Sequence, residues 1–308
     1  MSSDSGSNDE NNIKTLTPYN PNNILIQIGD IINILKCNGI DKINEKNINI
    51  DVYRQAFMHK SYTFKSNYEL SRKDDENIII SERPENCMDL SEGDSYEKLE
   101  FLGDRVVELV VVKHLFDRYN DLNGSDEGFL TKLKTRLVST KSLASFSEYL
   151  GFNKFMIVSK HVEEKCEGRV NPRILEDIFE AFIAALFLDF TEIETDTQQR
   201  YDLMSGPGYE ICEKFITTII ENTVDFENLI MNDDNYKDIL LRYFQNTYKI
   251  TPKYIEIEAE GPPHNRTFVM GVLDNQGSII GKGTKKSKKA AEQEASRQAL
   301  IYLDQLCE

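Results

Sequence analysis

The sequence predicts an all-α domain followed by a smaller α+β domain, and three observations support this fold class. Between residues 23 and 226, apolar side chains recur every three or four positions, which is the period of amphipathic helices. Over residues 236–305, a helical segment precedes three segments of alternating apolar and polar residues, and a second helical segment follows. Residues 236–303 contain 11 Lys and Arg against 7 Asp and Glu, although the whole chain of 308 residues has a net charge of −16. The last domain is therefore a basic module joined to an acidic body, which suits a polyanionic partner.

The first 22 residues predict a disordered tail, because their early part is rich in Ser, Asp and Asn. They lack the basic and apolar regions of a secretory signal. No segment approaches the roughly 18 apolar residues that suggest a membrane span, so we expect no membrane partner. The five cysteines lie far apart without a C-x-x-C pair, which disfavours a zinc site or a disulfide framework. We therefore expect an intracellular, cytoplasmic protein, or one of the host cytoplasm if its source is viral.

The helical domain, residues 23–226, contains an apolar helix that begins near Ile31 and three longer helical segments. These longer segments are residues 96–118, 129–150 and 174–188. Residues 63–95 show no such period and exceed the roughly 12–15 residues usual for a structureless loop, so we interpret them as a surface insertion. Residues 227–235 are interpreted as a linker.

The basic module, residues 236–305, has an α-β-β-β-α pattern. Its predicted elements are a helix over 236–246, strands over 253–260, 268–272 and 278–281, and a helix over 287–303. Ser287 stands where a helix N-cap is expected.

Two helical segments carry carboxylates in close pairs. Glu97, Glu100 and Asp104 fall at i, i+3 and i+7, which is one face of a helix. Asp177 and Glu180 fall at i and i+3, and the residues that follow them are nearly all apolar. Carboxylates beside an apolar helix are costly unless they are paired or bound to metal. Because oxygen ligands favour Mg²⁺ or Mn²⁺, the two sets together predict a divalent-cation site.

Two other interpretations of these acids remain open at this point. The first is an ordinary solvated helix face, which suits Glu97 best because single helical acids are usually solvated. The second is a di-iron carboxylate bundle, but that site needs Glu-x-x-His on two helices and neither segment offers it.

These segments, taken in order, resemble the ribonuclease III family. Residues 97–104 (EKLEFLGD) are similar to the family's signature helix, and residues 56–62 (AFMHKSY) to its upstream helix end. Residues 127–134 (EGFLTKLK) are similar to its accessory-acid segment, and residues 173–181 (RILEDIFEA) to its second catalytic helix. The α-β-β-β-α module is similar to a double-stranded-RNA-binding domain. The resemblance covers residues 23–305, and several motifs in the family's order make it specific.

The resemblance implies an endonuclease that uses Mg²⁺, or Mn²⁺ in its place, to cut double-stranded RNA as a homodimer. The products would carry 5′-phosphate and 3′-hydroxyl ends with short 3′ overhangs, in rRNA or mRNA processing or in duplex RNA degradation. The implied catalytic metal ligands are Glu100, Asp104, Asp177 and Glu180. Glu97 and Glu127 are implied accessory acids, and Phe101 is the implied dimer contact that enters a socket on the partner subunit.

Some residues depart from the family pattern. Tyr96 stands where Asn is common, Arg105 where Ser is usual and Lys285 where Gly is usual, and the 63–95 segment is longer than the usual connection. None of these changes removes a carboxylate, so we expect activity. Arg105 can pair with a neighbouring acid or reach toward RNA, or it can simply be solvated or lie at the dimer edge.

The basic module offers a surface for an A-form duplex, which proteins recognise mainly through its shape and phosphates. The predicted RNA contacts are Lys285, Lys286, Lys288, Lys289 and, in the loop 261–265, His264. The alternative is that these lysines only provide solubility. At the level of the whole chain, a duplex binder without catalysis and a dimeric scaffold with an inactive nuclease fold compete with the enzyme. The presence of all six candidate acids favours the enzyme.

Overall fold

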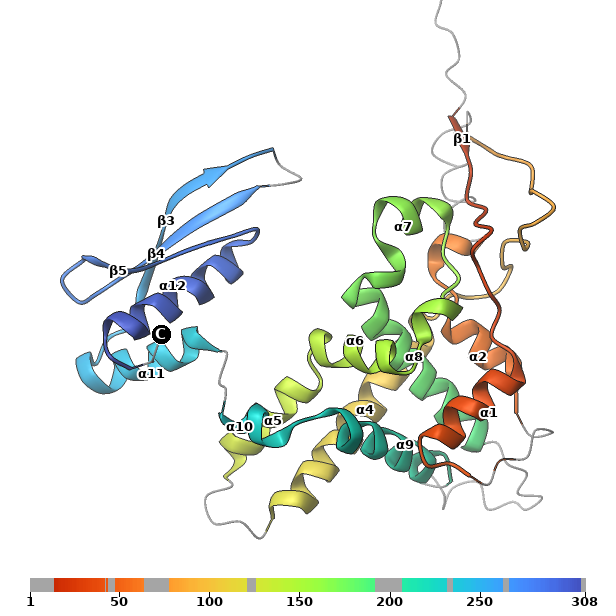
Figure 1. The fold of residues 1–308 in the computed structure, drawn as a ribbon, viewed down its shortest axis with the longest axis horizontal. Helices are drawn as coiled ribbons and strands as arrows, with labels where there is room; N and C mark the ends of the chain where they lie inside the picture. The colour runs from red at the N-terminus through yellow and green to blue at the C-terminus, as the bar shows by residue number, and fades with distance from the viewer. Residues whose placement is uncertain are drawn as a thin grey trace, which may run out of the picture. The chain divides into compact units, whose positions relative to one another are not determined.

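The computed structural model describes residues 14–41, 43, 48–63, 78–120, 126–191, 207–231, 235–262 and 266–305. The chain forms two compact units, residues 1–224 and residues 225–308. Figure 1 shows the first unit as a group of helices and the second as helices packed on one small sheet. No helix in the described ranges has the length and apolar character needed to cross a membrane.

Helices dominate the first unit, and α8 lies at its centre. The helices are α1 (Ile28–Cys37), α2 (Ile50–Ala56), α4 (Glu97–Tyr119), α5 (Glu127–Leu137), α6 (Thr140–Tyr149), α7 (Lys160–Lys165), α8 (Pro172–Thr191) and α9 (Pro207–Thr223). Helix α8 contacts α2, α4, α6 and α9. Its Phe182 ring meets the rings of Tyr53, Phe57, Phe152 and Phe215, with centroids 4.6–6.1 Å apart. This aromatic cluster explains why the second half of α8 is almost wholly apolar.

The predicted helical segment 129–150 consists of two helices. The segment 129–150 forms α5 and α6, because Ser139 between them is the N-cap of α6 and its side chain accepts a hydrogen bond from the Ser142 backbone amide. Apolar residues continue through this break, so the periodicity alone did not reveal it.

The predicted disordered tail, residues 1–22, is wrong for residues 14–22. Strand β1 (Lys14–Leu16) pairs in parallel with β2 (Ile78–Ile80). Asn20 is buried, and its amide donates a hydrogen bond of 3.1 Å to the Val158 carbonyl. The polar composition of this segment does not indicate these contacts, because the partner residues lie far away in the sequence. Residues 1–13 lie outside the described residues.

The predicted insertion, residues 63–95, is partly built into the first unit. Residues 64–77 lie outside the described ranges, but β2 and the segment after it pack against the body. The Tyr62 hydroxyl donates a hydrogen bond of 2.9 Å to the Met88 carbonyl. Cys87 is buried, and Thr63 forms a β-bridge with Ser91. The last part of the predicted insertion is therefore packed within the first unit before α4 begins.

The predicted linker, residues 227–235, differs in its first half. A short helix, α10 (Phe226–Met231), occupies residues 226–231, and the boundary between the two units falls between Val224 and Asp225. Residues 232–234 lie outside the described residues.

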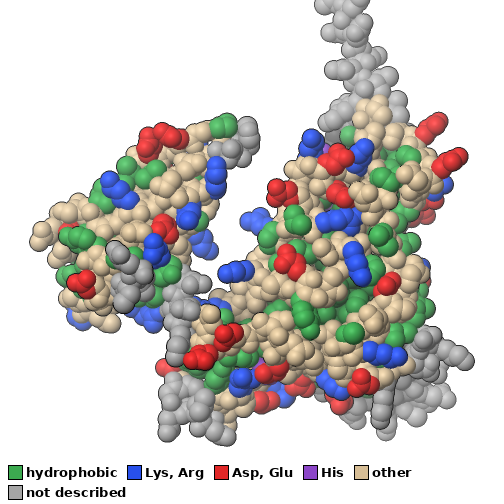
Figure 2. Space-filling model, in the orientation of Figure 1, with side chains coloured by type: hydrophobic (Ala, Val, Ile, Leu, Met, Phe, Trp, Pro, Cys, Tyr) green, Lys and Arg blue, Asp and Glu red, His purple; other side chains and the backbone are tan. Residues whose placement is uncertain are grey.

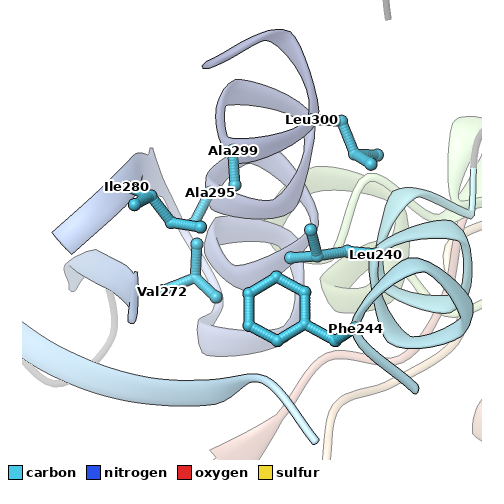
Figure 3. Packing of buried hydrophobic residues seen from close by; sticks show 7 residues of the cluster. All are labelled: Leu240, Phe244, Val272, Ile280, Ala295, Ala299 and Leu300. Carbon is cyan, nitrogen blue, oxygen red and sulfur yellow. The ribbon is translucent and has the colours of Figure 1, made fainter. Parts of the chain in front are cut away.

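The second unit has the α-β-β-β-α order that the sequence predicted. Its elements are α11 (Tyr236–Tyr248), β3 (Lys253–Glu260), β4 (Thr267–Leu273), β5 (Ile279–Lys285) and α12 (Lys288–Tyr302). The strands form an antiparallel sheet in the order β3-β4-β5. Side chains from both helices and from β4 and β5 meet in one core (Figure 3), and they are Leu240, Phe244, Val272, Ile280, Ala295, Ala299 and Leu300. Ser287 is the N-cap of α12, as predicted.

The third strand is longer than predicted because its glycines serve packing. A Cβ on Gly281 would lie 2.2 Å from the Ala295 carbonyl oxygen, and one on Gly283 would lie 2.1 Å from that of Ala291. Glycine in a strand often marks a place where another backbone approaches closely. In this unit α12 lies directly on β5, and the glycines that suggested an end of the strand permit that contact.

Candidate functional site

The site is organised by the crossing of α4 and α8 at Gly103. A Cβ on Gly103 would lie 1.8 Å from the carbonyl oxygen of Glu180, so only glycine allows this separation of the two helices. Glu100 and Asp104 lie within one turn of Gly103 on α4, and Asp177 lies one turn before Glu180 on α8. The crossing therefore brings the two predicted acid pairs to one place.

Electrostatic coupling between these acids is strongest at Glu180. Its side chain is 7% exposed. Burial, followed by the charges of Asp104, Glu176, Glu100 and Asp177, raises the pKa of Glu180 to about 8. Carboxylates repel one another in this way only when they are close. A cluster of mutually repelling, partly buried acids is an environment that a bound cation stabilises.

Asp177 and Glu100 are perturbed in the same direction. Burial raises the pKa of Asp177, while the Tyr96 hydroxyl, which donates a hydrogen bond of 2.9 Å to its carboxylate, opposes this rise. Burial also raises the pKa of Glu100, followed by the charges of Asp177 and Asp104. Both side chains are half-buried, so they remain accessible at the helix crossing.

Asp104 has a cationic partner next to it in the chain. The Arg105 guanidinium lies 2.6 Å from the Asp104 carboxylate and 2.9 Å from that of Glu108. Glu108 in turn accepts a hydrogen bond of 2.8 Å from Lys134 on α5. Arg105 therefore pairs with neighbouring acids, which is one of the roles considered for it from the sequence.

The oxygen-only donor set suits a hard divalent cation, but the acids do not form a closed cage. In the described part of the chain, no three Asp, Glu, His or Cys side chains converge closely enough to hold a metal ion. Asp104 is turned to Arg105 and Asp177 to Tyr96. The residue types and their burial fit a metal site.

The predicted accessory acids lie at the edge of this cluster. Glu97, the first residue of α4, accepts a hydrogen bond of 2.9 Å from Lys60, and this contact lowers the pKa of Glu97. Glu127 begins α5 and is exposed, and the structure shows no contact between Glu127 and the acids at the crossing.

Sequence reasoning missed Glu176 as a member of the cluster. Burial is the main cause that raises the pKa of Glu176, and its charge contributes to the raised pKa of Glu180. Its position four residues before Glu180 places both on one helix face, and that spacing was the available signal.

Phe101 lies in an exposed apolar stripe along α4. Its relative exposure is 77%, the largest among the exposed large hydrophobic residues of the described chain. Leu109, Val112 and Phe116 are exposed as well. With Phe101 they fall at helical spacings of three, four and eight, so they share one face of α4. A stripe of this kind on a soluble protein marks an interaction surface.

The predicted RNA-binding lysines surround the start of α12. Lys285, Lys286, Lys288 and Lys289 are all exposed. Figure 2 shows Lys and Arg side chains at the edge of the second unit where β5 leads into α12. Lys288 forms an ion pair of 2.6 Å with Glu256 on β3. His264 lies outside the described residues.

An open groove of about 400 Å³ lies beside this cluster, between the starts of α11 and α12. Lys237 and Lys289 are among its lining residues. The Lys237 ammonium group is 4.7 Å from the centroid of the Tyr254 ring, another lining residue. The groove therefore presents cationic groups from both helices.

Comparison with known proteins agrees with both units. The model of the ribonuclease III domain matches residues 97–191, and that of the double-stranded RNA binding motif matches residues 236–303. Ribonuclease 3 of Staphylococcus aureus (strain bovine RF122 / ET3-1) is 34% identical over 258 residues, which cover 84% of this chain and 88% of that protein. A probable ribonuclease 3 of Acanthamoeba polyphaga mimivirus is 36% identical over 211 residues, 68% of this chain and 34% of that protein.

Among solved structures, the nuclease domain of a ribonuclease III from Campylobacter jejuni is 25% identical and has a TM-score of 0.41. The match covers 63% of this chain and 97% of that one. The family models and the Staphylococcus aureus relative confirm the resemblance inferred from the sequence. The chain therefore belongs to the ribonuclease III family, whose members are endoribonucleases that act on double-stranded RNA.

Proposed function

We propose that the protein hydrolyses double-stranded RNA with the help of Mg²⁺, for which Mn²⁺ can substitute, at Glu100, Asp104, Asp177 and Glu180. The observation that carries this proposal is the close crossing at Gly103, which brings acids from two helices together in a partly buried place. A divalent ion there supplies a water of lowered pKa and neutralises the charge that develops on the phosphate.

The protein's own groups prepare this site. The Tyr96 hydroxyl orients the Asp177 carboxylate, and Lys60 holds Glu97 at the start of α4. Burial and the neighbouring carboxylates raise the pKa of Glu180 to about 8, so a cation held by Glu180 at neutral pH would displace its proton. The products we propose are 5′-phosphate and 3′-hydroxyl ends with short 3′ overhangs.

The second unit holds the duplex. Lys285, Lys286 and Lys289 surround the N-terminus of α12, where backbone amides also favour phosphate oxygens. These contacts are independent of sequence, so the unit selects duplex geometry. We propose His264 as a further contact, and Glu127 as an accessory acid that acts when RNA is bound.

The apolar stripe on α4 supports a homodimer as the working form. Phe101 lies one turn from Glu97 and Asp104, so a partner subunit packed on Phe101 would set a second site close to the first. Two sites would then cut one strand each. We propose roles in ribosomal or messenger RNA processing or in duplex RNA degradation, in the cytoplasm of the cell or of a host.

The test compares wild-type protein with Glu180→Gln on a long RNA duplex, in Mg²⁺, in Ca²⁺ and with a chelator. We expect Mg²⁺-dependent cleavage by wild type, at least a 100-fold loss in Glu180→Gln, and equal duplex affinity for both. Full cleavage by Glu180→Gln, or cleavage in the chelator, would remove the acids from the mechanism.

A duplex-binding protein without cleavage is the second candidate. The observation in its favour is that Arg105 occupies the Asp104 carboxylate and that no metal cage is formed among the described residues. Binding without cleavage in any divalent ion would establish this alternative.

A further inference from the structure

Arg105 is fixed in place by contacts on two sides. One guanidinium nitrogen lies 2.6 Å from the Asp104 carboxylate, and another lies 2.9 Å from Glu108. The second Glu108 oxygen accepts a hydrogen bond from Lys134 at 2.8 Å. The network Asp104–Arg105–Glu108–Lys134 therefore joins the acid cluster to α5. Lys134 contacts Glu108, and Glu108 in turn contacts the Arg105 guanidinium that pairs with Asp104.

The Asp104–Arg105 ion pair affects the other acids of the cluster. The charge of Asp104 is among the causes that raise the pKa of Glu180 and of Glu100, so Asp104 lies close to both acids. The positive charge of the Arg105 guanidinium beside Asp104 offsets part of the repulsion among these acids before any metal binds. The same charge repels a divalent ion that approaches the Asp104 carboxylate, and it occupies one of the two carboxylate oxygens.

We propose that Arg105 is a positioning residue that serves as an internal counter-ion for Asp104 and competes with the divalent cation for it. The metal concentration at which the site fills is then higher than it would be without the guanidinium. This inference rests on the proposed function in one respect, the role of Asp104 as a metal ligand.

Arg118 provides a matched comparison on the same helix. It is also an exposed arginine paired with an acid, Glu221 on α9. Thirteen residues separate it from Arg105, which is about 20 Å along an α-helix. At that distance its charge is largely screened from the acid cluster at ordinary salt concentrations.

The experiment measures Mn²⁺ binding to the full-length protein by calorimetry in the absence of RNA. We expect Arg105→Gln to bind Mn²⁺ about threefold to tenfold more tightly than wild type at low salt, because a repulsive charge and a competing ion pair are both removed. Arg105→Lys, which keeps the charge, should stay within about twofold of wild type, and so should Arg118→Gln. The gain in Arg105→Gln should shrink in 1 M salt.

The outcomes separate this inference from the proposed function. Equal or weaker Mn²⁺ binding by Arg105→Gln would overturn the counter-ion role, and so would an equal gain in Arg105→Lys or Arg118→Gln. Asp104→Asn should remove the site, and unchanged binding by that variant would instead overturn the assignment of Asp104 as a ligand. In cleavage assays, the Mg²⁺ concentration for half-maximal rate should fall in Arg105→Gln by the same factor as the dissociation constant.

Discussion

At Glu180, burial and charge act in the same direction. The side chain is almost fully covered, and four other carboxylates contribute to its raised pKa of about 8. Glutamate in an unfolded chain has a pKa near 4.5. The folded protein without metal therefore binds this proton more tightly than the unfolded chain does, and the contribution of Glu180 to the free energy of unfolding falls as the pH rises between these two values.

A prediction at the residue scale follows for the metal-free protein. Glu180→Gln should match wild type in its free energy of unfolding below about pH 4, where the glutamate is neutral in both the folded and the unfolded protein. At pH 9 the variant should be more stable, by on the order of 2 kcal/mol, because wild type must bury a charge.

Urea unfolding in a chelator at the two pH values measures this difference. An equal difference between the two proteins at both pH values would show that Glu180 does not titrate as described. Glu164, an exposed acid on α7, provides the control Glu164→Gln, which removes an acid outside the cluster.

The candidate acids were predictable from the sequence as a set, because spacing of three or four places them on helix faces. The partners of those acids were less accessible. Tyr96 and Arg105 were both noted as departures from the family pattern, and each contacts one proposed ligand. Asp104 and Arg105 are adjacent, so their pairing could be considered from the sequence. The contact of Tyr96 with Asp177 joins residues 81 positions apart, and no local pattern specifies it.

At the scale of elements, the α4–α8 crossing determines whether the acids meet. A Cβ on Gly103 would contact backbone atoms of α8, which cannot rotate away as a side chain can. Gly103→Ala should therefore separate the helices, lower the free energy of unfolding by about 1–3 kcal/mol and greatly reduce cleavage.

Gly29 offers the matched control, since it also lies in a helix and a Cβ there would meet nothing within 4 Å. Gly29→Ala should be neutral or slightly stabilising. Unfolding by urea and cleavage at saturating Mg²⁺ measure both variants, and similar behaviour of the two would contradict the close contact.

Elements with a regular spacing of apolar residues were predicted well. Elements that contain glycine within a strand, or that depend on a partner distant in the sequence, were not. Helices α4 and α8 and strand β3 agree with the sequence analysis within a few residues. Strand β5 was predicted too short because glycine usually interrupts a strand, whereas here it admits α12. The pairing of β1 with β2 escaped prediction because residues 14–16 and 78–80 are distant in sequence and no alternation distinguishes either segment.

At the scale of the whole molecule, the chain of net charge −16 would have to associate with itself through the apolar stripe on α4. Apolar burial must then exceed the repulsion between two acidic bodies. Association should consequently strengthen with added salt, which screens like charges.

Phe101→Ser tests the homodimer. Truncation of an exposed aromatic residue at the centre of an interface often costs 2 kcal/mol or more, so we expect the dimer dissociation constant to rise by a factor of about 30. Tyr149 on α6 is also an exposed aromatic residue, and Tyr149→Ser should leave the constant unchanged. Sedimentation equilibrium measures both variants, and a monomeric wild type at high micromolar concentration would exclude the homodimer.

The ion pair between Lys288 and Glu256 affects how duplex binding should respond to salt. A lysine that meets a phosphate usually releases condensed counterions from the nucleic acid, and the slope of affinity against salt concentration counts such contacts. When Lys288 leaves Glu256 for a phosphate, the carboxylate it abandons takes up cations from solution. Uptake and release partly cancel, so the slope should report fewer phosphate contacts than the number of lysines that touch the RNA.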